Sequence, residues 1–202
     1  MPHYVKQHIK QYGHKLLNKP QHTPLRPAPR KYEASAQEPE PPYTSSPLDA
    51  KDKKFVERVV GSFLYYGRAV DPTILHALST IASEQANPTQ QTLKKVTTFL
   101  NYMAIHPESI IRFYKFDMIL QIHSDASYLT ALKSRSRAGG HFFLGSVPFN
   151  NVPIKLNGTI HYLCKILRFV ASSAEEAELG ALFLNAREAK ILCITLHELG
   201  HP

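Results

Sequence analysis

The sequence has little cysteine, no long apolar run and, over its first 32 positions, no acid. Its 202 residues include two cysteines, Cys164 and Cys193. That number excludes a disulfide scaffold, and we expect reduced thiols in an intracellular protein of the cytoplasm or nucleus. No apolar run approaches the roughly 18 residues of a membrane span. The N-terminus MPHYVKQHIK lacks the apolar stretch of a secretory signal. The sequence therefore predicts neither an integral membrane protein nor a secreted one.

The scarcity of acid at the start concentrates the chain's positive charge there. Residues 1–32 hold seven Lys or Arg and no Asp or Glu, so they carry +7 of the formal net charge of +8. Nine of the 15 prolines lie in residues 1–50, and proline favours extended backbone around it. We expect residues 1–50 to form a flexible basic arm. The arm serves either as a spacer or, through its interleaved Lys, Arg and Tyr side chains, as a contact to nucleic-acid phosphates.

Residues 51–107 have the apolar spacing of helices. Four apolar residues recur at helical intervals: Phe55, Val59, Phe63 and Tyr66. Asp71-Pro72 is a start signal for the next helix, because Asp caps a helix and Pro suits its first position. Asn87-Pro88 separates that helix from a third. Three helices joined by short breaks predict a small bundle.

Beyond residue 107 the apolar period becomes that of strands. SIIRFYK and MILQIHSD flank the turn Phe116-Asp117 and predict a hairpin, after which ALKSRSRAGG predicts a charged loop. HFFLGSV and TIHYLCKILRFVA predict further strands. SSAEEAELGALFLNAREAKILCITLHELG predicts one long helix, with Ser172 or Ser173 as N-cap and Glu175 and Glu176 in the first turn. The fold class expected is α+β, with a helix over an antiparallel or mixed sheet.

Two acids stand where the sheet and the helix are expected to meet. Asp125 ends an apolar run, so it is either a turn residue or a metal ligand at a sheet edge. Glu178 shares a helix face with Ala181 and Leu182, and we expect that face to turn toward the sheet. A carboxylate there needs a partner. Two such carboxylates suit Mg²⁺, although two-metal phosphodiester chemistry uses more than two acids.

Three blocks in order resemble the ribonuclease H region of copia-type long-terminal-repeat retrotransposon polyproteins: HSDASY, RSRAGGHFFLGS and SSAEEAELGAL. VGSFLYYGRAVDPTILHALSTIASEQANPT resembles the segment that joins reverse transcriptase to RNase H in the same polyproteins. MPHYV resembles the sequence MPGYI near the end of their polymerase region. The resemblance covers residues 1–5 and 55–202. It implies a helical connection segment over 51–107 and an incomplete RNase H-like domain over 108–202.

The resemblance implies Mg²⁺-dependent hydrolysis of the RNA strand of an RNA/DNA hybrid, with Mn²⁺ as a substitute ion. Asp125 matches the first catalytic acid and Glu178 the acid of the helix, and both would be metal ligands. The loop between the first two core strands would carry three cations: Lys133, Arg135 and Arg137. These cations either meet the phosphates of the hybrid or lie in a solvated turn. A hybrid would be recognised by its shape and its 2′-hydroxyls.

The sequence departs from the family pattern after the long helix. The family has a further strand with an Asp-Asn pair and a later acid, whereas this sequence stops at His201-Pro202. We therefore expect a fragment of a reverse transcriptase and ribonuclease H that holds its ion weakly and is inactive as it stands. The alternative is a non-catalytic remnant that binds nucleic acid through its basic arm.

A second motif competes with this interpretation. Residues 197–201 spell HELGH, an HExxH motif in which two histidines on a helix share Zn²⁺ and the Glu acts as general base. A zinc protease needs a third ligand, and only Pro202 follows. We also expect Gly200 to end the helix, which would remove His201 from the i+4 position. A zinc protease is therefore less favoured than the RNase H interpretation.

Overall fold

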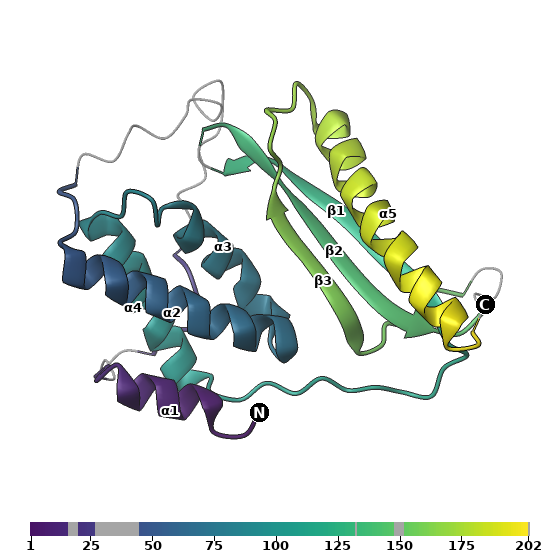
Figure 1. Cartoon of the computed structure of the whole chain (residues 1–202), viewed down its shortest axis with the longest axis horizontal. Coiled ribbons are helices and arrows are strands. Elements are labelled where there is room, and N and C mark those ends of the chain that lie inside the picture. Colours follow the sequence, from purple (N-terminus) through teal and green to yellow (C-terminus); the bar gives the residue numbers. More distant parts are fainter. Residues whose placement is uncertain (16–19, 27–44, 132, 148–151, 202) are drawn as a thin grey trace. The chain divides into compact units, whose positions relative to one another are not determined.

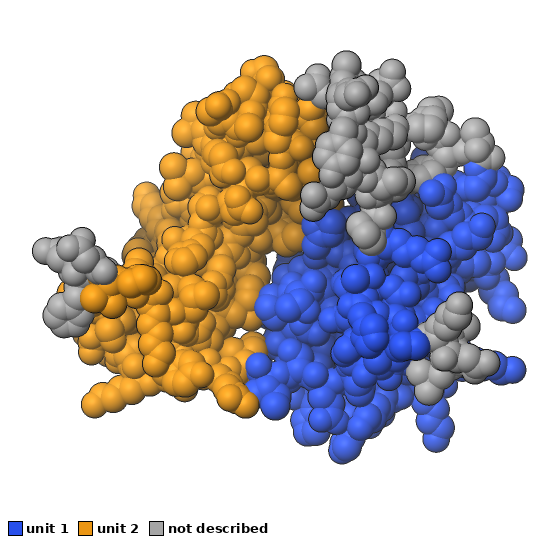
Figure 2. Space-filling model, turned by 180° about the vertical axis from the view of Figure 1, so that it is seen from behind, with its two compact units in different colours: residues 1–110 blue, residues 111–202 orange. Residues whose placement is uncertain are grey.

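The computed structural model of the chain describes residues 1–15, 20–26, 45–131, 133–147 and 152–201. Contacts within the chain divide it into two compact units, residues 1–110 and 111–202, which are coloured separately in Figure 2. Unit 1 is helical, and unit 2 combines a sheet with a helix. The described chain is therefore an α+β protein. The boundary between the units lies close to the predicted one at 107/108.

Unit 1 contains the helices predicted for residues 51–107 and one more before them (Figure 1). They are α1 (Tyr4–Gln11), α2 (Ala50–Ala69), the short 3₁₀ helix η2 (Pro72–Ile74), α3 (Leu75–Ser83) and α4 (Gln90–Ile105). The Asp71 carboxylate accepts a hydrogen bond from the Thr73 backbone N–H at 3.2 Å, as expected of an N-cap. At the start of α4, the Thr92 hydroxyl accepts from the Thr89 backbone N–H at 3.1 Å. Local capping therefore sets where these helices begin.

The core of unit 1 lies between the apolar faces of α2, α3 and α4. Phe63 of α2 and Phe99 of α4 are fully buried, and their rings meet edge to face at a centroid separation of 5.2 Å. Tyr66 is buried on the same side of α2 as Phe63, and Phe55 packs at the margin of the cluster. The prediction, made from the spacing of these residues, that one side of α2 is apolar is therefore confirmed.

The first helix belongs to this core. Val5 is fully buried, and the Tyr4 hydroxyl donates to the Ser62 carbonyl oxygen at 3.0 Å. The hydroxyls of Tyr12 and Ser62 are hydrogen-bonded at 2.8 Å. The prediction of a flexible arm over residues 1–50 is therefore wrong for α1. A helix with so few apolar residues is not stable alone, but it is stabilised where the bundle offers it an apolar surface. Residues 16–19 and 27–44 of the expected arm lie outside the described residues.

Unit 2 is a three-stranded antiparallel sheet with one long helix across one face (Figure 1). Its elements are β1 (Ile119–Ala131), β2 (Arg135–Gly145), β3 (Thr159–Ile166) and α5 (Ala174–Glu198). The spatial order of the strands is β1-β2-β3. The helix α5 packs on β1 and β2. Among the described residues, no helix is long and apolar enough to pass through a membrane.

Two predicted details of the sheet are wrong. Residues 109–115, expected to form the first strand of a hairpin, are not in a strand, and most of the expected charged loop over 131–140 belongs to β2. The ladder explains the second difference. Asp125 pairs with Gly139 and Ser127 with Arg137, so the antiparallel pairing of β1 continues through the charged segment.

The start of α5 is as the sequence predicts. The Ser173 hydroxyl accepts a hydrogen bond from the Glu176 backbone N–H at 3.2 Å. In return, the Glu176 carboxylate accepts from both the hydroxyl and the backbone N–H of Ser172, each at 2.6 Å. The hydrogen bond from the Ser172 hydroxyl lowers the pKa of Glu176 most, and the bond from the Ser172 backbone N–H lowers it further. Glu176 therefore caps the helix, as its first-turn position indicated.

Candidate functional site

The packing of α5 on the sheet assigns each residue of β1 to a face. The buried side-chain amide of Asn185 donates to the Ser124 hydroxyl at 2.8 Å and to the Gly139 carbonyl oxygen at 2.9 Å. Ile122 and Ala126 pack in the apolar cluster beneath the same helix. Because successive strand residues point to opposite faces, positions 122, 124 and 126 face α5. Asp125 therefore points to the other face of the sheet.

The two predicted metal ligands are both exposed. Asp125 lies within β1 rather than at its end, which excludes the turn interpretation. On α5, Ala177 and Ala181 are buried against the sheet, whereas Glu178 and Leu182 are exposed. The expectation that the face of Glu178 turns toward the sheet is therefore correct for Ala181 and wrong for Glu178 itself. The structure does not bring the two carboxylates together on one face of the sheet.

The described residues include no group of three or more His, Cys, Asp or Glu side chains placed to hold a metal ion. Asp125 and Glu178 carry the oxygen ligands that Mg²⁺ prefers. An octahedral ion held by either carboxylate by itself would keep most of its coordinated waters. Such an ion would be held mainly by water, and the expected weak binding of Mg²⁺ stays a prediction.

The three cations predicted for one loop are divided between a turn and a strand. Lys133 is exposed in the β1–β2 turn, with φ of 60°, and Arg135 begins β2. Arg137 is a buried strand residue whose Nη1 lies 4.0 Å from the Cys164 Sγ. The prediction of a phosphate-facing or solvated loop is therefore wrong for Arg137. For Lys133 at the turn, and for Arg135 at the first position of β2, a contact with phosphates stays a prediction.

The face of Asp125 carries a group of rings that sequence analysis missed. His123 lies two residues before Asp125 and pairs across the ladder with His141, with ring centroids 6.3 Å apart. The His141 ring stacks on Phe143 at 5.0 Å and lies parallel to Tyr162 of β3 at 6.4 Å. Burial, and then the charge of His123, lower the pKa of His141. The only sequence signal was the two-residue spacing of His123 and Asp125, which places both on one face of a strand.

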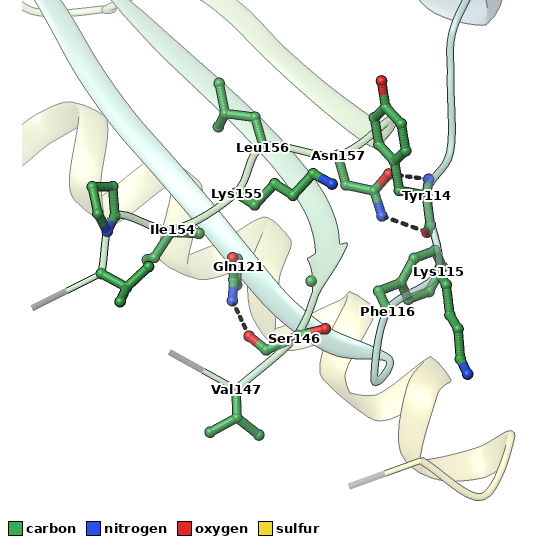
Figure 3. A pocket seen from close by; sticks show the side chains of 13 residues that line it. Tyr114, Lys115, Phe116, Gln121, Ser146, Val147, Ile154, Lys155, Leu156 and Asn157 are labelled. Carbon is green, nitrogen blue, oxygen red and sulfur yellow. Dashed lines mark hydrogen bonds between the residues drawn. The ribbon is translucent and has the colours of Figure 1, made fainter. Parts of the chain in front are cut away.

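A pocket of about 180 Å³ opens at one end of the sheet, between the chain before β1, the end of β2 and the chain before β3 (Figure 3). Asn157 joins two of its walls, accepting from the Tyr114 backbone N–H at 2.8 Å and donating to the Tyr114 carbonyl at 3.2 Å. The Lys155 Nζ lies 4.4 Å from the centroid of the Tyr114 ring. The buried Gln121 amide donates to the Ser146 carbonyl at 2.8 Å. Sequence analysis singled out none of these residues.

The HExxH motif is interrupted by the end of α5. Gly200 has φ of 83°, and its N–H donates to the His197 carbonyl at 3.0 Å. The next N–H, that of His201, donates to the Leu196 carbonyl at 2.9 Å. This pair of bonds is a Schellman motif, which ends a helix at a left-handed glycine. The prediction that Gly200 removes His201 from the helix is confirmed, so the two histidines do not share a helix face.

Comparison with known proteins adds no identification to the fold. No protein-family model, curated protein or solved structure matches the chain. The class that the structure itself defines is an α+β protein with a helical unit and a sheet–helix unit.

Proposed function

We propose that unit 2 is an RNase H-type module and that the chain is a fragment of the reverse transcriptase–RNase H region of a copia-type retrotransposon. The observation that carries the proposal is the order of the elements in space: three antiparallel strands in the order β1-β2-β3, then a helix across β1 and β2. Asp125 stands in β1 and Glu178 near the start of α5. Asp125 belongs to the block HSDASY and Glu178 to the block SSAEEAELGAL, on which the resemblance rests.

The open edge of β1 supports the proposal. Among the described strands, β1 has a neighbour on one side only. The helix α5 follows β3 and crosses β2 and β1. A strand that followed α5 by the usual right-handed crossover would therefore lie at the open edge of β1 and run parallel to β1. An acid on such a strand would lie beside Asp125. This would begin the carboxylate cluster that two-metal hydrolysis needs.

The ancestral activity we propose is Mg²⁺-dependent hydrolysis of RNA in RNA/DNA hybrids. Asp125 and Glu178 are its proposed ligands, and Mn²⁺ is a substitute ion. In the arrangement of β1 and α5 described above, these carboxylates do not converge on one ion. Misplacement of a reacting group by about 1 Å can cost about 100-fold in rate. We therefore expect the chain by itself to bind a hybrid without cleaving it at a useful rate.

The cleavage experiment compares four chains on a labelled RNA/DNA hybrid with Mg²⁺ or Mn²⁺. They are the chain itself, Asp125→Asn, Glu178→Gln, and the chain extended by a strand with the family's acids. We expect background from the first three and cleavage from the extended chain, abolished there by Asp125→Asn. The matched control is the same extension with its acids replaced by asparagine. Cleavage by the unextended chain that Asp125→Asn abolishes would contradict the expected inactivity. A folded extended chain that does not cleave would contradict the RNase H assignment.

The binding experiment measures the affinity for the same hybrid as salt is raised. Each lost phosphate contact reduces the slope of log K against log salt by about 1. We expect Lys133→Ala and Arg135→Ala each to weaken binding and to lower that slope. The control is Arg187→Ala on the exposed surface of α5. If Lys133→Ala and Arg135→Ala changed binding no more than the control does, the β1–β2 turn would be excluded as the contact with the hybrid.

A further inference from the structure

Two histidines from distant parts of the chain meet in unit 1. The Nδ1 atom of His22 lies 3.3 Å from the Nε2 atom of His106, and the two residues are 84 positions apart in the sequence. The ring centroids are 5.5 Å apart, and the ring planes meet at 60°. His22 is exposed and His106 is half-buried, so a small ion in solution can reach the pair. Sequence analysis gave neither residue a role.

His106 is held by the end of α4. Its backbone N–H donates to the Tyr102 carbonyl at 2.9 Å and caps the helix. Pro107 follows, and a proline restricts the backbone of the residue before it. The His106 ring also packs on the Tyr102 ring, with centroids 4.7 Å apart. One member of the pair is therefore fixed by contacts that do not involve the other.

His22 is held by a short turn in the segment of residues 20–26. The Gln21 side-chain amide donates to the Thr23 carbonyl at 2.7 Å and to the Thr23 hydroxyl at 3.0 Å, so a local bond spans His22. Three residues after His22, Leu25 packs against the apolar core of unit 1. The position of His22 beside α4 therefore rests on its neighbours as well as on His106.

The two facing nitrogens have the separation of two ligands on one zinc ion. In a tetrahedral site, Zn–N bonds of about 2.0–2.1 Å place two imidazole nitrogens about 3.3–3.4 Å apart. A hydrogen bond between His22 and His106 accounts for the same distance, but it requires a proton on one of the facing nitrogens. A zinc ion requires a lone pair on both. The two states therefore differ in where the ring protons lie.

We propose that His22 and His106 bind Zn²⁺ and that the ion ties the segment of residues 20–26 to the end of α4. Imidazole suits Zn²⁺, whereas Mg²⁺ prefers oxygen ligands. Across the part of the chain that the structure describes, no third His, Cys, Asp or Glu completes a group of three. Water would therefore fill the other positions of a tetrahedral ion. We expect a site that fills reversibly when Zn²⁺ is added and retains no ion through purification. The proposal does not depend on nuclease activity.

The first experiment is a calorimetric titration of the untagged full chain with Zn²⁺. We expect one ion per chain at this pair. His22→Asn and His106→Ala should each weaken its binding at least about 10-fold, the smaller loss usual for a residue that supports a metal ligand. Asn at position 22 keeps an amide near the place of Nδ1, so it can still form a hydrogen bond to His106. The loss in that variant therefore reports the missing zinc ligand.

His123→Ala is the matched control, because His123 belongs to another pair of neighbouring histidine rings, that with His141. It should leave binding at the His22–His106 pair unchanged. A chain that binds no Zn²⁺ would overturn the proposal. Losses from His22→Asn and His106→Ala no larger than that from His123→Ala would overturn it as well.

The second experiment identifies the coordinating nitrogens in ¹H–¹⁵N spectra of the imidazole rings. Zinc at the pair should leave the proton of His22 on Nε2 and that of His106 on Nδ1, because the facing nitrogens hold the ion. The spectrum of His3, which is exposed at the start of α1, should not change. A proton that stays on either facing nitrogen at saturating Zn²⁺ would show that the pair is a hydrogen bond only, and would overturn the proposal.

The third experiment measures whether the ion ties the two segments together. An ion at about 100 times its dissociation constant suppresses, by up to about 100-fold, any opening that must release it. We therefore expect Zn²⁺ to slow hydrogen exchange at the backbone amides of residues 21–26. His106→Ala, which lies outside this segment, should abolish the slowing, and exchange in α3 should not respond to Zn²⁺. Zinc binding that leaves exchange over 21–26 unchanged would overturn the tie to α4.

Discussion

The side-chain amide of Asn185 in α5 donates a hydrogen bond of 2.8 Å to the hydroxyl of Ser124 in β1, one residue before Asp125. The same amide donates to the Gly139 carbonyl at 2.9 Å, so one buried side chain holds the helix on two strands. A Cβ atom added to Gly140 would lie 1.9 Å from the Asn185 Oδ1. The lack of a side chain at Gly140 is therefore what allows Asn185 to reach the sheet.

Gly140→Ala should destabilise unit 2 by about 1–3 kcal/mol, since the added methyl group overlaps the Asn185 amide and the helix must move away. Urea unfolding followed by circular dichroism measures the change. Gly139→Ala is the matched control in the same strand, because a Cβ there would lie 3.6 Å from the Asp125 carbonyl oxygen, an ordinary contact. The control should be neutral or stabilising by about 0.4–1 kcal/mol. Equal effects of the two substitutions would show that Asn185 does not determine the approach of α5.

Val5→Ala should destabilise unit 1 by about 1–3 kcal/mol, because Val5 is fully buried in the bundle. It should also speed trypsin cleavage after Lys6 and Lys10, which α1 carries. Gln7→Ala, at an exposed position of the same helix, should change neither. If Lys6 and Lys10 of the unchanged chain were cleaved as fast as in an unfolded peptide, α1 would be a detached arm after all.

Acidification should destabilise unit 2 through His141. Its pKa in the folded chain lies below its ordinary value, which is about 6.5. The folded state therefore binds fewer protons than the unfolded state, and the stabilisation present above about pH 6.5 is lost as the pH falls through the folded pKa. Unfolding measured from pH 8 to pH 5 should show this loss, and His141→Phe should reduce it. His3→Gln, at an exposed site, is the control. A pH dependence that His141→Phe leaves unchanged would assign the effect to another group.

The HELGH sequence should bind no stoichiometric zinc and support no proteolysis. The Schellman motif at Gly200 places His201 outside the helix, so His197 and His201 do not share a face. Metal analysis of an untagged chain and a casein digestion assay test this, with Glu198→Gln as the matched variant. Tight zinc at one ion per chain, with proteolysis that Glu198→Gln abolishes, would mean that the C-terminal turn rearranges around the metal.

The candidate site shows where prediction from the sequence stops. The acids Asp125 and Glu178 were found from the pattern, and so was the strand–helix context in which they stand. Their directions were not, because the face of a strand residue depends on its register with a partner strand. The cross-strand pair of His123 and His141 was missed for the same reason: the β1–β2 ladder alone brings the two rings together.

The sequence by itself determined the ends of the helices and the α+β order of the elements. Asp71, Ser173 and Gly200 act within one turn of the backbone, so their effect does not depend on distant residues. Only the tertiary structure decided that α1 joins the bundle and that residues 135–140 extend a strand. The tertiary structure also decided that Asn185, rather than Glu178, faces the sheet. Each of these outcomes depends on apolar area or backbone partners supplied by segments far away in the chain, and no local signal carries that information.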